Sequence, residues 1–190
     1  MTVICDENHV YTVNGVKKPG VSEIMEAAGL IDRTWFNEHA CLRGQYVHRA
    51  IQLHHTDGLD RASLDAEILP YFAGSRVFLR QSGFRPVLVE TPMHDPIYDF
   101  CGTPDLIGWL GDRLVLIDVK TGAPADWHKI QTAAYQHLAG GRVEGMRIAS
   151  RVGLYLSDTG RYTTREYVHR NDISVFLAAL TILNFKNGKL

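Results

Sequence analysis

Three short strand-like segments in the middle of the chain, bracketed by helical patterns, narrow the possible folds more than any other feature. They run from Val87 to Met93, from Tyr98 to Trp109 and from Leu114 to Val119, and they are rich in β-branched or aromatic residues. Asp-Pro and Gly-Asp turn signals separate them, so we expect consecutive neighbouring strands. Because helical periodicity precedes and follows them, the sequence predicts an α/β fold with a mixed central sheet flanked by helices.

The chain is expected to form a single domain, because 190 residues leave little room for a second one and no linker or repeat interrupts the pattern. In chain order, we expect an N-terminal hairpin over residues 1–20, a helical part over 21–82, a sheet over 83–170 that includes a helix over 125–139, and a C-terminal helix over 171–190.

Some boundaries within these parts are specific enough to check. Asn14-Gly15 is a hairpin-turn dipeptide, and Ser22 is expected to cap the first helix. A long helix should follow from Arg33 to about His55, and another from Asp65 to Ser82.

Composition and charge exclude several classes of protein. With 45% hydrophobic and 22% charged residues the chain fits soluble globular proteins, and no apolar stretch is long enough to cross a membrane. Asp6 and Glu7 occupy the region where a secretory signal needs a basic and then an apolar run. The three cysteines, Cys5, Cys41 and Cys101, form no C-x-x-C pair, so a cytoplasmic location is expected. The net charge of −1 means that any contact with nucleic acid must use a local patch.

The strongest chemical signal lies at the end of the third strand, where Asp118 and Lys120 interrupt an apolar run. Alternate side chains of a strand share a face, so these two should point the same way while Val119 packs behind them. A buried acid and lysine are expected there only if they are paired or bound to a metal. If the strands are antiparallel neighbours, Asp105 folds back beside Asp118. The two carboxylates could then share a hard cation, with the Val119 carbonyl as a further ligand. The simpler interpretation is a salt bridge at a strand end and an Asp105 that caps a turn.

Two helices carry companions to this signal. Gly44 costs about 1 kcal/mol inside a helix, which predicts a close approach of another backbone one turn before His48. Gln131 and Tyr135 stand four residues apart and therefore share one helix face. Taken alone, His48 is more often a surface or capped histidine, and the other two residues could serve packing.

In this order the motifs resemble the PD-(D/E)XK nuclease superfamily, and within it the RecB-like branch found in recombination and phage exonucleases. That branch has a G-x-x-x-H helix, a G-x-x-D strand, a D-x-K strand and a Q-x-x-x-Y helix. Here these are Gly44 to His48, Gly102 to Asp105, Asp118 to Lys120, and Gln131 to Tyr135. The resemblance covers about residues 11 to 168 and implies a restriction-endonuclease-like core.

The resemblance also implies the roles of the site residues. The residues expected to hold Mg²⁺ or Mn²⁺ are His48, Asp105, Asp118 and the carbonyl of Val119. The residues expected to carry catalysis are Lys120, Asp118, Asp105, Gln131 and Tyr135. Lys120 would orient or polarise the attacking water. Glu90 is a candidate for an outer metal contact or a second metal, or else it is a solvated strand residue. No iron-sulfur cluster is expected, because members of the branch that carry one have four cysteines flanking the core.

The implied function is a metal-dependent deoxyribonuclease, an exonuclease rather than an endonuclease, in recombination, repair or phage DNA processing. Its partners would be DNA and a recombinase, a single-strand annealing protein or a helicase, in a bacterial cell or a phage-infected host. The alternative is a catalytically silent DNA-binding or assembly protein that keeps the nuclease fold. Strand polarity, single- or double-strand preference, the number of metals and the oligomeric state stay open, because they depend on channel shape and assembly.

A DNA-binding surface is harder to place from the sequence. The basic residues that could form a positive rim around the acidic centre are Lys17, Lys18, Arg43, Arg49 and Lys129. They could equally be ordinary solvated side chains.

Overall fold

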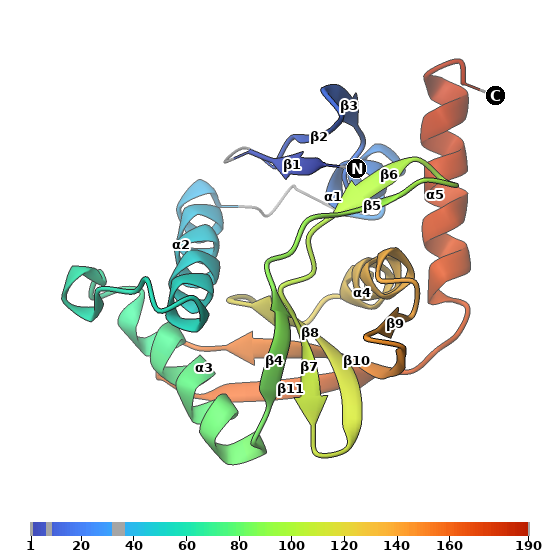
Figure 1. The fold of residues 1–190 in the computed structure, drawn as a ribbon. Coiled ribbons are helices and arrows are strands. Elements are labelled where there is room, and N and C mark those ends of the chain that lie inside the picture. The colour runs from blue at the N-terminus through green and yellow to red at the C-terminus, as the bar shows by residue number, and fades with distance from the viewer. Residues whose placement is uncertain (1, 7–8, 32–36, 190) are drawn as a thin grey trace.

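The computed structural model describes residues 2–6, 9–31 and 37–189 of the chain. A six-stranded sheet lies at its centre, in the order β11-β10-β8-β7-β4, with β9 paired to β10 (Figure 1). Strands β8 and β10 run parallel and the other neighbouring pairs are antiparallel, so the predicted mixed sheet is confirmed. The strands are β4 (Arg85–Val89), β7 (Leu106–Leu110), β8 (Arg113–Lys120), β9 (Arg142–Val143), β10 (Met146–Leu156) and β11 (Tyr162–Tyr167).

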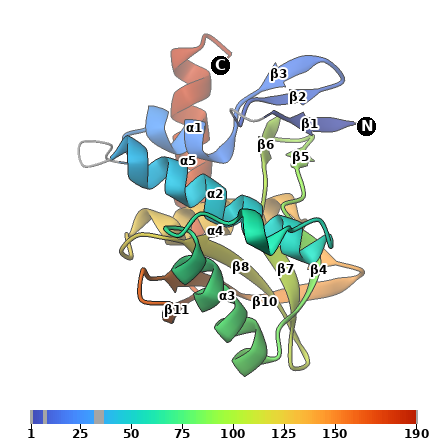
Figure 2. The same ribbon diagram turned by 90° about the vertical axis from the view of Figure 1, so that its left-hand side faces the viewer.

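Helices cover both faces of this sheet, as the fold class predicts. Helices α2 and α3 lie on one side, and α4 and α5 lie on the other, with α1 above α4 and beside α5 (Figures 1 and 2). The helices are α1 (Val21–Ala27), α2 (Glu38–His55), the short 3-10 helix η1 (Arg61–Ser63), α3 (Leu69–Ser82), α4 (Trp127–Leu138) and α5 (Asp172–Lys186). Among the described residues, no helix combines the length and the apolar character that a membrane crossing requires.

Strand β8 is buried on both faces, which explains its nearly continuous apolar sequence. Leu114 and Leu116 belong to the core formed with α1, α4 and α5. Val115, Ile117 and Val119 belong to the core formed with α2 and α3. The polar residues at its carboxyl end therefore stand out against a strand whose other positions are dictated by packing.

Two of the three predicted central strands are each divided in two, which corrects the sequence prediction. The segment expected from Val87 to Met93 consists of β4 and β5 (Met93–Asp95). The segment expected from Tyr98 to Trp109 consists of β6 (Phe100–Gly102) and β7. Strands β5 and β6 pair with each other in a separate two-stranded sheet.

The division arises from a bend at Glu90 and Pro104. Glu90 has a φ of 43°, outside the extended region, and follows the last residue of β4. Pro104 has no N–H to donate to a strand neighbour. At the bend, the Glu90 N–H donates a hydrogen bond of 2.8 Å to the Asp105 carbonyl oxygen. The bend therefore brings these two acids together at the end of the central sheet where β4 ends and β7 begins.

The N-terminal hairpin is present, with one more strand than expected. Strands β2 (Tyr11–Val13) and β3 (Val16–Lys18) are antiparallel, and β1 (Val3–Cys5) pairs with β2. Asn14 and Gly15 have φ values of 49° and 81°, as the tight turn that this dipeptide favours requires.

The expected cap at Ser22 is wrong, because α1 begins at Val21 with Gly20 as its N-cap. Glycine suits this position because a Cβ on Gly20 would lie 2.9 Å from the ring of Tyr11. The Gly20 N–H donates to the Glu23 carboxylate at 3.4 Å. Packing against the hairpin therefore decides where this helix starts.

The starts of the two longer helices also differ from expectation. Helix α2 is described from Glu38, with Asn37 as its N-cap, and its expected start at Arg33 lies outside the described residues. Helix α3 begins at Leu69 rather than Asp65, because the Asp65 carboxylate accepts a 2.8 Å hydrogen bond from the Glu67 N–H and closes a turn instead.

Candidate active site

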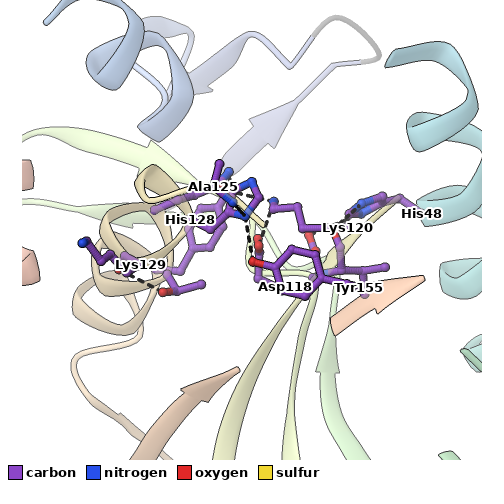
Figure 3. Close-up of polar contacts among 12 residues, drawn as sticks. His48, Asp118, Lys120, Ala125, His128, Lys129 and Tyr155 are labelled. Carbon is purple, nitrogen blue, oxygen red and sulfur yellow. Dashed lines mark hydrogen bonds and ion pairs between the residues drawn. The ribbon is translucent and has the colours of Figure 1, made fainter. Parts of the chain in front are cut away.

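The carboxyl end of β8 carries the polar pair that the sequence predicts. Lys120 Nζ lies 2.7 Å from Asp118 Oδ2, and both side chains are on the same face of the strand, as expected. Asp118 is only 1% exposed, so this is a buried ion pair rather than a surface one. Figure 3 shows the pair at the strand end, between His48 and His128.

Asp105 lies beside this pair because β7 and β8 are antiparallel neighbours, as predicted. Its Oδ2 accepts a hydrogen bond of 2.6 Å from the Val119 N–H. The carboxylate is therefore held against the backbone of β8, with its other oxygen toward His48 at 3.4 Å.

The ring of His48 reaches the same place from α2. Its Nδ1 lies 3.1 Å from Glu90 Oε1, and its Nε2 lies 3.1 Å from the Val119 carbonyl oxygen. Ligand atoms of His48, Glu90 and Asp105 all lie within 4.8 Å of one another. That separation suits ligands of a single ion, whose bonds are about 2.0–2.6 Å long. Glu90 thus belongs with His48 and Asp105 to the group of residues that could hold an ion. The carboxylate of Asp118 is instead paired with Lys120.

The prediction that another backbone approaches Gly44 closely is wrong. A Cβ on Gly44 would meet the Thr121 hydroxyl at 3.4 Å, which is ordinary contact with a side chain and not a close backbone. Helix α2 is seated on the sheet by its buried residues Val47, Ala50 and Ile51. Val47 precedes His48, so the burial of this face orients the histidine ring toward the end of β8.

The charges of His48 and Asp105 shift each other's pKa. Burial alone would lower the pKa of His48, but the carboxylates of Asp105 and Glu90 raise it well above its usual value. Burial would raise the pKa of Asp105, but His48, Lys120 and the Val119 N–H together lower it. Without a metal, this pair is therefore an imidazolium and a carboxylate.

The pKa values of the other two acids, Glu90 and Asp118, are raised, which disfavours their charged forms. Burial and then the Asp105 carboxylate raise the pKa of Glu90. Burial raises the pKa of Asp118 to about 6, against the opposing effect of Lys120. Apart from its ion pair, neither Asp118 oxygen accepts a hydrogen bond within the described part of the chain. A buried carboxylate whose only ion-pair partner among the described residues is Lys120, next to two further acids and a histidine, fits a divalent cation.

Lys120 is oriented by residues of α4. Its Nζ donates a hydrogen bond of 2.9 Å to Gln131 Oε1, and it lies 5.5 Å from the centre of the Trp127 ring. Gln131 in turn donates to the Tyr135 hydroxyl at 3.1 Å. The expected shared face of Gln131 and Tyr135 is therefore occupied by one hydrogen-bonded chain that ends on the lysine.

Tyr135 also explains the glycine of the G-x-x-D motif. A Cβ on Gly102 would lie 2.7 Å from a methyl of Leu138, 2.9 Å from Val21 and 3.0 Å from the ring of Tyr135. Glycine is required because α1 and α4 pack directly on this strand. The motif thus joins a packing residue to a site residue, Asp105, on one short segment.

Two residues near the site have no signal in the sequence. His128 Nδ1 accepts a hydrogen bond of 3.2 Å from the Ala125 N–H and lies 2.8 Å from the Tyr155 hydroxyl. Tyr155 stands beside Lys120 in the parallel pairing of β8 and β10. Because those strands come together only in the folded chain, spacing along the sequence could not reveal this cluster.

His128 predicts a specific dependence of stability on pH. Burial, followed by the charges of Lys120 and Arg165, lowers its pKa to about 3. The unfolded chain, with a histidine pKa of about 6.5, binds a proton that the folded chain does not, so stability falls as pH drops below about 6.5. From pH 7 to pH 5 the wild type should lose about 2 kcal/mol more than His128→Asn. Urea unfolding at both pH values measures this, and identical losses in the two proteins would contradict it.

Most of the cations expected to form a positive rim have partners. Lys18 pairs with Asp99 at 2.7 Å, and Arg43 pairs with Glu67 at 3.4 Å. Lys129 lies 3.6 Å from Asp126, and Arg49 donates to Gln52 at 2.6 Å. These positions are less available to DNA than the sequence indicates.

Comparison with known proteins finds similarity at the level of structure alone. No family model and no curated protein matches the chain. A candidate exonuclease from Eubacterium rectale is 16% identical, with a TM-score of 0.49 over 91% of this chain and 82% of that one. SSO0001 is 15% identical, with a TM-score of 0.42 over 86% and 74%. The alkaline exonuclease LHK-Exo from Laribacter hongkongensis is 16% identical, with a TM-score of 0.35 over 90% and 92%.

Two of these three neighbours are described as exonucleases. Their identities are below 20%, so what this chain does must be inferred from its own site.

Proposed function

We propose that this chain is a Mg²⁺- or Mn²⁺-dependent deoxyribonuclease that removes nucleotides from DNA ends. The observation that carries the proposal is the convergence of His48, Glu90 and Asp105 within 4.8 Å, next to the Lys120–Asp118 pair. These residues come from α2, the bend after β4, the start of β7 and the end of β8. Packing alone does not require three acids and a histidine at one buried strand end.

His48, Glu90 and Asp105 would hold the cation, with Asp118 and the Val119 carbonyl as further oxygen ligands. When bound, a divalent ion would neutralise the scissile phosphate and lower the pKa of the attacking water. Histidine binds metal in its neutral form, so the proton that the metal-free site holds on His48 must leave on loading. Raising the pH should therefore favour metal binding.

Lys120 supplies the fixed positive charge of the proposed reaction. Its ammonium is held by Asp118 at 2.7 Å and by Gln131 at 2.9 Å, and its side chain is 16% exposed. A charge already aimed toward the substrate stabilises the extra negative charge on the phosphate without reorganising during the reaction. Asp118 holds the ammonium in an ion pair, and Gln131 and Tyr135 fix its direction.

Space for a nucleotide lies directly beyond Lys120. A pocket of about 380 Å³ is lined by Thr121 and Gly122 after β8, by Tyr155 beside Lys120, and by Tyr71 of α3. Carboxyl ends of parallel strands are common ligand sites in α/β folds. This position is compatible with a DNA strand that passes the proposed metal centre.

The motif resemblance further supports a role in recombination, repair or phage DNA processing. The setting would be the cytoplasm of a bacterial cell or a phage-infected host. A recombinase, a single-strand annealing protein or a helicase would be the protein partner.

The decisive experiment incubates the purified chain with end-labelled linear DNA and with closed circular DNA, in Mg²⁺, in Mn²⁺ and in EDTA. We expect linear DNA to be degraded with either metal, circular DNA to be spared, and both to survive in EDTA. Cleavage of the circle at a similar rate would indicate an endonuclease. Intact DNA in every condition, with DNA binding retained, would favour the catalytically silent alternative.

A further inference from the structure

Three arginines line one pocket outside the candidate active site. Arg61 lies on η1, and Arg76 and Arg80 lie one turn apart on α3. The pocket has a volume of about 340 Å³. Its other walls are apolar and are formed by Leu69, Phe72, Ala73 and Val77. Three positive charges therefore surround a hollow whose other lining side chains are apolar.

These arginines lack the acidic partners that other cations of the chain possess. Within residues 2–6, 9–31 and 37–189, no ion pair joins Arg61, Arg76 or Arg80 to an aspartate or glutamate. The nearby carboxylate of Asp60 accepts the Ala62 N–H at 2.9 Å instead. None of the three guanidinium groups is therefore held by a carboxylate in the residues that the structure describes.

The histidines at the end of α2 do not change this charge. Arg76 contacts His54 through its guanidinium, and His54 packs edge-on against Phe72 in the pocket floor. Burial and then the charges of Arg76 and Arg61 lower the pKa of His54, and only Asp57 opposes them. His54 is therefore a neutral neighbour that accepts from Arg76, and the pocket stays cationic through its arginines.

We propose that this arginine pocket binds phosphate groups of the DNA backbone on the path of the substrate away from the cleavage site. The inference rests on the proposed nuclease function and adds where the DNA lies. Guanidinium groups suit phosphate because their planar donors can engage two oxygens at once. An apolar floor also leaves these donors with fewer competing partners than an exposed surface would.

Helix α2 relates the pocket to the metal-site residues. His48 and His54 are six residues apart on α2, which corresponds to about 9 Å along its axis. Successive nucleotides of one duplex strand rise by about 3.4 Å, so this axial offset spans about three nucleotides. The DNA would therefore run from the end of β8 along α2 toward η1 and α3 (Figure 2).

The test is the salt dependence of DNA binding without cleavage. Binding of a fluorescein-labelled duplex of about 20 base pairs is followed by fluorescence anisotropy in EDTA, from about 50 to 200 mM KCl. The key variant is Arg61→Gln with Arg80→Gln, since both side chains are exposed. The matched control is Arg147→Gln with Arg170→Gln, which removes two exposed arginines elsewhere.

Each phosphate contact contributes about 0.9 to the slope of log affinity against log salt, so the key variant should lose about 1.8. Its affinity near 100 mM KCl should fall about tenfold, while the control keeps the wild-type slope and affinity. In cleavage assays KM should rise with kcat within about twofold, since these residues are remote from the reacting atoms.

An unchanged slope in the key variant, or an equal loss in the control, would overturn the arginine pocket while cleavage by the wild type leaves the nuclease proposal standing. A wild type that does not bind DNA would also overturn it. Conversely, arginine-dependent binding by a chain that never cleaves DNA would support the pocket and overturn the nuclease proposal alone.

Discussion

An Asp105→Asn variant should lose divalent-metal binding and DNA cleavage together, each by about 100-fold or more. Asparagine keeps the shape of the side chain and can still accept the Val119 N–H that Asp105 accepts at 2.6 Å. What it removes is the negative charge that faces His48 at 3.4 Å and completes the group with Glu90. The fold should therefore persist while the metal site fails.

Calorimetric titration with MnCl₂ and cleavage of linear DNA measure the two effects. Asp95→Asn is the matched control, because Asp95 is a partly buried aspartate that pairs with His137 at 3.0 Å outside the metal group. It should retain Mn²⁺ affinity and cleavage. Wild-type metal affinity in Asp105→Asn would remove this residue from the site and leave His48 and Glu90 as unexplained neighbours.

A Lys120→Met variant should lose cleavage by about 100- to 1000-fold while keeping its metal affinity. Methionine preserves most of the apolar stem beside Trp127 and removes only the ammonium that Asp118 and Gln131 hold. Loss of a nearby positive charge cannot weaken the attraction of a cation, so Mn²⁺ should bind as tightly as before or slightly more tightly. Cleavage and metal binding are thus expected to separate at this residue.

Two further variants test whether metal binding and cleavage depend on different residues. Asp118→Asn should lose both metal affinity and cleavage if its carboxylate is a ligand, whereas Lys129→Met, on a half-exposed lysine of α4, should lose neither. Equal losses of Mn²⁺ affinity in Lys120→Met and Asp118→Asn would contradict the separate roles. Because Lys120→Met leaves a buried carboxylate without its cation, thermal unfolding must show that the variant is folded.

Local rules were enough to predict several features of this molecule. The alternation of a strand places Asp118 and Lys120 on one face, and the spacing of a helix places Gln131 and Tyr135 on one face. Both arrangements are present, because each depends only on backbone geometry within a few residues. The mixed sheet followed from the same rules, since strand and helix periods alternate along the chain.

Long-range packing accounts for what these rules missed. The bend at Glu90 turns a predicted continuous strand into β4 and β5 and brings this acid next to Asp105 and His48. Tyr155 stands beside Lys120 because β10 pairs with β8, and Arg61 lines the same pocket as Arg76 although 15 residues separate them in the sequence. Sequence patterns describe neighbours along the chain, whereas these contacts join residues far apart in it, and burial in the folded core selects which of them form.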